Sequence, residues 1–253
     1  MHIIPIKNIP LINPGDDLAA IIIRAFQDNG VSLRKNDIVA ITSKIVSKAD
    51  GRMVNLSQIE PSSEAVDLAE KTAKDPRFVE LVLRESRSVL RYKPGALVVE
   101  HRCGFVCANA GIDHSNVNVQ DGNPEDWVLL LPANPDQSAR EIRTRLERHY
   151  GVEIGVAIID SHGRAWRMGT VGTAIGISGV PGLVDMRGMK DISGYHLRIT
   201  EVGIADELAA AASLVMGQAA ERIPVVLVRD FPYQLRESSA QELLRPRDQD
   251  MFR

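Results

Sequence analysis

The sequence is poor in aromatic residues and in cysteine, and each shortage excludes a class of protein. Aromatic side chains make up 4% of the 253 residues. That is too few for a single-stranded nucleic-acid binder, which stacks bases on several aromatic platforms. The two cysteines, Cys103 and Cys107, fall short of the four soft ligands in two pairs that a structural zinc site usually needs. We therefore expect two ordinary packed or exposed thiols.

Long apolar runs and an excess of charge of one sign are also missing. No stretch approaches the roughly 18 consecutive apolar residues of a membrane span, and the N-terminus lacks the charged start and apolar core of a signal peptide. We therefore expect a cytoplasmic protein. The 30 basic and 33 acidic residues give a net charge of -3, which provides no general attraction to nucleic acid. The expected partner is a small molecule.

Several well-known catalytic motifs are absent as well. The glycine-rich segment 169–182, GTVGTAIGISGVPG, fits neither the dinucleotide fingerprint nor the P-loop, so neither a Rossmann nor a P-loop fold is expected. No paired-histidine zinc motif and no G-x-S-x-G elbow occurs, which disfavours zinc and serine hydrolases. The glycines themselves fit two interpretations: backbone amides that approach a phosphate, or tight turns and close strand packing.

The rest of the sequence alternates between helical and strand-like segments without the regular rhythm of a βαβ protein. Apolar or β-branched segments predict strands at His2–Ile6, Asp37–Val46, Ala96–Glu100, Trp127–Leu131, Val152–Ile159 and Pro224–Val228. Amphipathic spacing and capping residues predict helices at 18–30, Ser62–Lys74, Pro76–Ser88, Asp136–Tyr150 and Ala205–Met216. The tail from Leu235 to Arg253 is expected to be a surface helix or disordered. The pattern predicts an α+β fold of mixed architecture.

Two polar segments carry candidate metal ligands. In Asn109–Asn116 the carboxylate of Asp113 is flanked by amide and hydroxyl groups, a set of oxygen ligands that suits magnesium or manganese. The same residue types also close turns by hydrogen bonding to their own backbone, so both interpretations stand. In Asp160–Arg164 an acid, a hydroxyl and a cation follow the predicted strand. The carboxyl end of a strand is a common place for a functional site.

Basic residues at the end of a predicted strand provide candidate anion ligands. Ser43, Lys44 and Lys48 lie at and just after the buried strand that begins near residue 37. A lysine there is either solvated or a point-charge partner for phosphate. Arg164 and Arg167 can each bind a phosphate through two hydrogen bonds. The spacing therefore leads to the hypothesis that four cations surround one polyphosphate.

Five motifs in a fixed order carry a family resemblance. They are IPLINPGDD, SKIVSKADGR, NAGIDHSN, IIDSHGR followed by GTVGTAIGISGV, and ADELAAAASLVMGQ. Together they resemble the coenzyme F420:L-glutamate ligase family over almost the whole chain, from about Ile6 to Arg229. The resemblance implies an enzyme that uses GTP to activate the lactyl-phosphate carboxylate of the coenzyme F420 precursor, F420-0, as an acyl phosphate. The amine of L-glutamate would then attack, and further glutamates can follow by γ-linkage.

The resemblance also implies which residues form the site. The catalytic residues would be Asp113, Asp160 and Lys48, and the metal ligands would be Asp113, Asp160, Ser161 and Gln218. The GTP site would be lined by Ile9, Pro10, Leu11, Ile12, Ser43, Lys44, Lys48, Asn116, Met216, Gly217, Gln218, Ala219, Ala220, Glu221, Arg222 and Ile223. Two positions depart from the family pattern, in which Thr follows the second aspartate and Glu can stand at the position of Gln218. Ser161 keeps the hydroxyl, whereas Gln218 keeps an oxygen but not the charge.

Assembly and ions are implied in the same way. Because the family resembles an intertwined homodimer, we expect one mixed α/β unit of two interleaved lobes over residues 1–253, paired with a second copy. Some members carry an additional C-terminal nitroreductase-like domain, which we expect to be absent here. The expected ions are two magnesium or manganese ions, together with a monovalent cation such as potassium.

Two other functions stay open on the sequence alone. Motifs for GTP and metal say little about the second substrate, so a nucleotide-dependent carboxylate-amine ligase for another acid is one alternative. A non-catalytic GTP-binding protein is the other, although intact Asp113, Asp160 and Lys48 argue against it. A purely structural protein would leave the ordered polar motifs unexplained.

Overall fold

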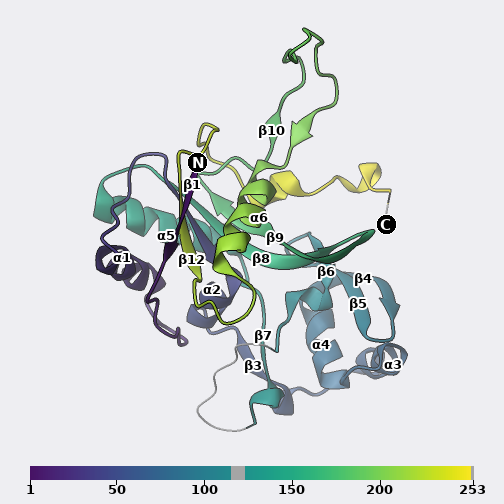
Figure 1. Cartoon of the computed structure of the whole chain (residues 1–253). Helices are drawn as coiled ribbons and strands as arrows, with labels where there is room; N and C mark the ends of the chain where they lie inside the picture. The colour runs from purple at the N-terminus through teal and green to yellow at the C-terminus, as the bar shows by residue number, and fades with distance from the viewer. Residues whose placement is uncertain (115–122, 252–253) are drawn as a thin grey trace.

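A mixed five-stranded sheet forms the centre of the protein. The computed structural model describes residues 1–114 and 123–251. The strands of the sheet, in spatial order, are β1 (His2–Ile6), β12 (Val225–Arg229), β2 (Ile38–Thr42), β8 (Gly155–Arg164) and β9 (Arg167–Ser178). Within this sheet β2 and β8 run parallel, and the other neighbouring strands run antiparallel (Figure 1). The predicted α+β class is confirmed.

Helices cover both faces of this sheet. One face packs against α1 (Leu18–Asp28) and α5 (Pro135–Tyr150), and the other against α6 (Ile204–Met216). The side chains of β2 alternate between the two resulting cores, because successive residues of a strand point to opposite faces. Val39 and Ile41 join the first core, whereas Ile38 and Ala40 join the second. This explains why the strand is apolar throughout.

A smaller unit with its own core lies beside the large sheet. Its elements are α3 (Ser63–Thr72), α4 (Pro76–Arg84), β4 (Ser86–Lys93), β5 (Ala96–His101), β6 (Val106–Ala108), β3 (Met53–Asn55) and β7 (Trp127–Leu129). Phe78, Leu97 and Val128 are buried in that core. A two-stranded arm, β10 (Val184–Asp185) and β11 (Glu201–Val202), projects from the opposite side of the molecule (Figure 1). Among the described residues, no helix has the length and apolar character needed to cross a bilayer.

Three predicted element boundaries are wrong. The strand predicted to run to Val46 ends at Thr42, and α2 (Ser43–Ala49) begins directly after it. Ile45 and Val46 favour strands by themselves, but both side chains reach the core from α2, so packing overrides propensity. The helix predicted to reach Ser88 ends at Arg84, because β4 starts at Ser86 and pairs with β5.

The third boundary matters most for the site. The strand that carries Asp160 was predicted to end there, but β8 continues to Arg164 because its ladder with β9 extends to the pair Arg164 and Arg167. Asp160 is therefore held in the middle of a strand and not in a loop.

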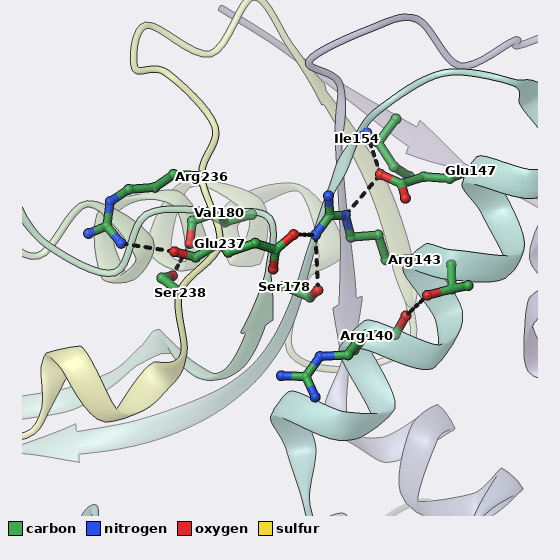
Figure 2. A network of polar contacts seen from close by, with 10 residues as sticks. Arg140, Arg143, Glu147, Ile154, Ser178, Val180, Arg236, Glu237 and Ser238 are labelled. Carbon is green, nitrogen blue, oxygen red and sulfur yellow. Dashed lines mark hydrogen bonds and ion pairs between the residues drawn. The ribbon is translucent and has the colours of Figure 1, made fainter.

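The C-terminal segment is ordered against the body, contrary to the prediction of a surface helix or disorder. It contains two short 3-10 helices, Ala240–Leu243 and Arg247–Gln249. Arg143 of α5 anchors its beginning: the guanidinium donates to Glu147 Oε1 at 2.9 Å and also bonds Glu237 (Figure 2). The segment is thereby tied to the helix that covers the sheet.

The glycine-rich segment forms β9, where two glycines lie against helices. A Cβ on Gly172 would lie 2.5 Å from the carbonyl oxygen of Ala209 in α6, and one on Gly176 would lie 2.4 Å from the carbonyl carbon of Pro135 in α5. Real Cβ atoms do not approach so closely, so both positions need glycine. Close packing of β9 between two helices therefore accounts for these two glycines.

Replacing Gly176 by alanine should destabilise the fold, because the new methyl group would displace the backbone of α5. We expect the free energy of unfolding to fall by about 1–3 kcal/mol, the usual cost of overpacking a core, as measured by urea denaturation. Gly163→Ala, in the same hairpin but with no atom within 4 Å of the added Cβ, serves as the control. Equal losses in the two variants would contradict the packing argument.

Candidate active site

One edge of the central sheet gathers the predicted site residues. β2 and β8 run parallel and end together, with Thr42 opposite Ile159. At the same edge β1 ends and β12 begins, since Ile6 pairs with Val225 and Val225 pairs with Ile41. The start of α2, the middle of β8, the loop after β1 and the loop before β12 therefore meet at this edge.

Asp160 lies at the centre of this edge and is held from two sides. The Ser43 hydroxyl donates to Oδ1 of Asp160 at 2.6 Å, and Nε2 of His162 lies 3.1 Å from Oδ2. Burial alone would raise the pKa of Asp160, but the contacts with His162 and Ser43 and the charge of Lys44 outweigh it and leave the pKa lowered. Asp160 is therefore a carboxylate at neutral pH.

Asp113 comes from the smaller unit and reaches the same place. Its backbone pairs with Leu129, donating at 3.0 Å and accepting at 2.8 Å. Its carboxylate accepts a hydrogen bond from the ammonium of Lys44. Burial lowers the pKa of Lys44, and the charge of Asp160 opposes that shift. The two carboxylates thus lie beside the consecutive residues Ser43 and Lys44.

Lys48 lies one turn further along α2, on the same side as Lys44. It is only 8% exposed, and its ammonium makes no hydrogen bond or ion pair with any residue in the described part of the chain. Burial, and then the charge of Lys44, lower the pKa of Lys48. A buried charge is costly unless it is paired. This lysine is therefore placed to bind an anion.

Ser161, which follows Asp160 in β8, forms a second group of oxygen atoms with Gln218, on the side of the strand that faces α6. The Ser161 hydroxyl donates to Oε1 of Gln218 at 2.9 Å, and Nε2 of Gln218 donates to the Ser213 hydroxyl at 2.8 Å. Carboxylate, hydroxyl and amide oxygens are the ligands that magnesium and manganese prefer. Within residues 1–114 and 123–251, no three His, Cys, Asp or Glu side chains cluster as a metal site. Any ion held here would have two carboxylates at most from the described residues.

The loops predicted to line the nucleotide site flank this edge. In the loop after β1, Ile12 is buried in the first core while Leu11 is 67% exposed. In the loop before β12, Glu221 accepts a hydrogen bond from the Ala219 amide at 2.8 Å, and the Pro224 carbonyl accepts one from Thr42 at 2.9 Å. The remaining predicted members, Ile9, Pro10, Met216, Gly217, Ala220, Arg222 and Ile223, belong to the same two loops or to the end of α6.

One predicted residue, Asn116, lies outside the described residues. Two of the four predicted cations lie away from the site. Arg164 and Arg167 close the exposed tip of the β8–β9 hairpin, and Arg164 is about 13 Å further along the strand than Asp160 at roughly 3.3 Å per residue. The structure brings Lys44 and Lys48 together on α2 but places the two arginines at the hairpin tip.

The sequence analysis missed His162 as a site residue. Its side chain is 9% exposed and faces the carboxylate of Asp160. Residues two apart on a strand share one face of the sheet, so the spacing could have revealed this pair. The predicted end of the strand at Asp160 concealed it.

Comparisons with known proteins identify the family of this chain. The family model described as F420-0:Gamma-glutamyl ligase matches residues 7–230. A protein of Methanothermobacter thermautotrophicus named coenzyme F420:L-glutamate ligase is 46% identical, over 100% of this chain and 99% of its own length. Proteins of the same name from Methanopyrus kandleri (46% identical, over 98% of this chain and 97% of the relative) and Archaeoglobus fulgidus (40%, over 100% and 96%) are similar throughout. The chain therefore belongs to the F420-0:gamma-glutamyl ligase family.

Proposed function

We propose that this protein joins L-glutamate, by γ-linkage, to the coenzyme F420 precursor F420-0, and that it uses GTP and a divalent metal to do so. The name of the relatives supports the acceptor and the amino acid. The observation that supports a bound nucleotide is Lys48, a largely buried residue whose ammonium no described residue pairs, in the same helix as Lys44. A polyphosphate would supply the missing negative charge.

The proposed chemistry proceeds in two steps. An oxygen of the F420-0 carboxylate attacks the γ-phosphorus of GTP, the bond to the β-phosphate oxygen breaks, and GDP leaves. The nitrogen of glutamate then attacks the carbonyl carbon of the acyl phosphate, the amine loses a proton, and inorganic phosphate leaves. Water has to be kept out between the steps, because it would hydrolyse the acyl phosphate.

The lysines address the main obstacle to the first step. A carboxylate that approaches a polyphosphate is slowed by charge repulsion and by misalignment, so positioning and neutralisation are what the protein has to supply. Lys44 and Lys48, four residues apart on α2, present two ammonium groups on one side of that helix. In the proposal they hold phosphate oxygens in line with the attacking carboxylate.

The oxygen atoms near the lysines fit a hard divalent cation. Asp113 and Asp160 would hold one magnesium or manganese ion, and Ser161 with Gln218 would contribute to a second; a monovalent cation such as potassium is part of the same proposal. When bound, such ions neutralise phosphate charge and orient the phosphates. Because Asp113 is already paired with Lys44, its carboxylate would be shared between the lysine and the ion.

Mass spectrometry tests the proposed reaction. The purified chain is incubated with F420-0, GTP, L-glutamate and manganese, and we expect a mass gain of one or more glutamyl units that disappears when GTP or metal is omitted. Asp160→Asn should abolish the gain while the thermal unfolding midpoint stays near that of the wild type, because Asn keeps the hydrogen bond from Ser43 but loses the ligand charge.

Two results would redirect the proposal. Consumption of GTP with another acid but not with F420-0 would indicate a carboxylate-amine ligase with a different substrate. Absence of GDP and phosphate release with every acid tested would indicate a non-catalytic GTP-binding protein. Near-normal addition of glutamate by Asp160→Asn would refute the metal assignment.

Lys48→Met should separate nucleotide binding from stability. Methionine keeps the apolar length of the side chain but not the charge, so we expect GTP to bind about 10–100-fold more weakly, the loss of one charge-assisted hydrogen bond. The free energy of unfolding should stay equal or rise, because an unpaired ammonium on a largely buried side chain is removed. Isothermal titration with GTP and urea denaturation measure the two effects.

Lys35→Met is the matched control. Lys35 is exposed, pairs with Glu153 and precedes β2 at the opposite end of the sheet, so its loss should leave GTP binding unchanged. If both variants bind GTP as tightly as the wild type, Lys48 is not part of the nucleotide site.

We further propose that the protein is a homodimer, with the β10–β11 arm at the contact. The arm carries large apolar side chains that one copy leaves in water: Met189, Ile192, Tyr195 and Ile199 are each at least half exposed. Sedimentation equilibrium should give twice the 27.8 kDa of one chain, and replacing Ile192 and Ile199 together by serine should shift the mass toward that of the monomer. A monomeric wild type would contradict the proposal.

A further inference from the structure

Three rings in contact connect the smaller unit to the candidate site. His101 and Phe105 lie at the two ends of the turn between β5 and β6, and their rings stack with centroids 4.8 Å apart at an angle of 2°. The ring of Phe105 also contacts that of His162 in β8, with centroids 5.3 Å apart at 44°. β6 and β8 are neighbours at this point (Figure 1). The row of rings therefore ends at the histidine that faces Asp160.

His162 is confined at its polar end as well as on its ring. Its Nε2 atom is buried and makes no hydrogen bond of good geometry with any described residue. Oδ2 of Asp160 lies 3.1 Å from this nitrogen. Oδ1 of the same carboxylate is bonded by Ser43. The two oxygens of Asp160 are thus contacted by two different residues.

Two internal hydrogen bonds close the turn that carries Phe105. The His101 amide donates to the Phe105 carbonyl at 2.9 Å, and the Cys103 amide donates to Nδ1 of His101 at 3.0 Å. Burial, with the charge of nearby arginines, lowers the pKa of His101 to about 4, so its ring is neutral and Nδ1 accepts that bond. One tautomer and one ring orientation are therefore fixed.

The C-terminal segment braces the same turn from outside. Gln241 donates to the Cys103 carbonyl at 2.9 Å. Gly104 has φ +99, and a Cβ there would lie 2.6 Å from the side chain of Leu244. The turn can hardly move without also moving the segment packed on it, so Phe105 offers His162 a fixed surface.

We propose that His162 is a positioning residue of the ligase reaction. It holds Oδ2 of Asp160 while Ser43 holds Oδ1, and Phe105 keeps its ring in place, so that the carboxylate is fixed in the orientation in which it binds the metal. Partners of this kind typically change metal affinity by about 10–100-fold. This inference rests on the proposed function, since it requires that Asp160 be a metal ligand.

Manganese binding to the intact purified chain tests the inference directly. Electron paramagnetic resonance counts free Mn²⁺ and gives the dissociation constant without turnover. We expect His162→Ala to raise that constant about 10-fold or more, whereas His162→Gln, whose amide nitrogen can take the place of Nε2, should recover most of the affinity. In turnover, the Mn²⁺ concentration for half-maximal rate should rise in parallel, while KM for glutamate stays unchanged.

His2→Ala is the matched control, because it removes an exposed histidine that lies 3.6 Å from the carboxylate of Asp230, far from the candidate site in the sheet. It should bind Mn²⁺ like the wild type. Wild-type affinity in His162→Ala would overturn the inference, and so would a His162→Gln variant as weak as His162→Ala, since a donor at that position would then be irrelevant.

Nitrogen-15 NMR of the histidine rings provides a readout that needs no metal. The ring nitrogens of His162 should shift when Asp160 is replaced by asparagine, and unchanged shifts would show that the contact does not form and would overturn the inference. A wild-type chain that binds no Mn²⁺ would instead refute the metal assignment of the proposed function, and the positioning role with it. Failure of the inference alone is therefore distinguishable from failure of the proposed function.

Discussion

The candidate site depends on the parallel pairing of β2 with β8. Parallel strands end at the same edge of a sheet, so this one pairing brings Ser43, the first residue after β2, next to Asp160 of β8. Antiparallel pairing would place those residues at opposite edges. The two cores on either face hold the pair in register, because a slip of one residue would exchange the side chains of the two faces. The geometry of the carboxylate thus follows from the packing of the sheet.

The charges at this edge are arranged asymmetrically. Each carboxylate has partners: Asp160 contacts Ser43 and His162, and Asp113 contacts Lys44. Lys48 is buried without a comparable partner among the described residues. If only contacts within the protein mattered, an apolar residue in place of Lys48 would raise the free energy of unfolding. Retention of the ammonium is consistent with a role in binding that costs some stability.

Much of the fold could be predicted from local signals. α1, α5 and α6 have clear amphipathic or apolar patterns, and α4 begins with a capping aspartate, Asp75, followed by Pro76. The errors at α2 and β8 arise because tertiary contacts decide them: two β-branched residues enter a helix to reach the core, and a strand is prolonged by a ladder with a later segment. Neither contact can be predicted from the local sequence.

Part of the candidate site could also be predicted, but from ordered sequence motifs and not from local structural signals. The five ordered motifs identified Asp113, Asp160 and the lysines, although nothing in their spacing shows that residues so far apart in the chain meet. His162 was not predicted because only two tertiary contacts place it in the site: its Nε2 lies near Asp160, and its ring contacts the ring of Phe105. Both contacts exist only after β5, β6 and β8 have come together.

The strand order has a consequence for how the chain acquires its structure. β12 lies between β1 and β2, although β2 ends at Thr42 and β12 begins at Val225. During synthesis β1 and one side of β2 must therefore stay unpaired until the segment through Arg229 has left the ribosome. Such long-range pairing slows folding and exposes intermediates to aggregation. Until β12 has been made, β1 and one side of β2 are thus open to pairing with strands of other chains.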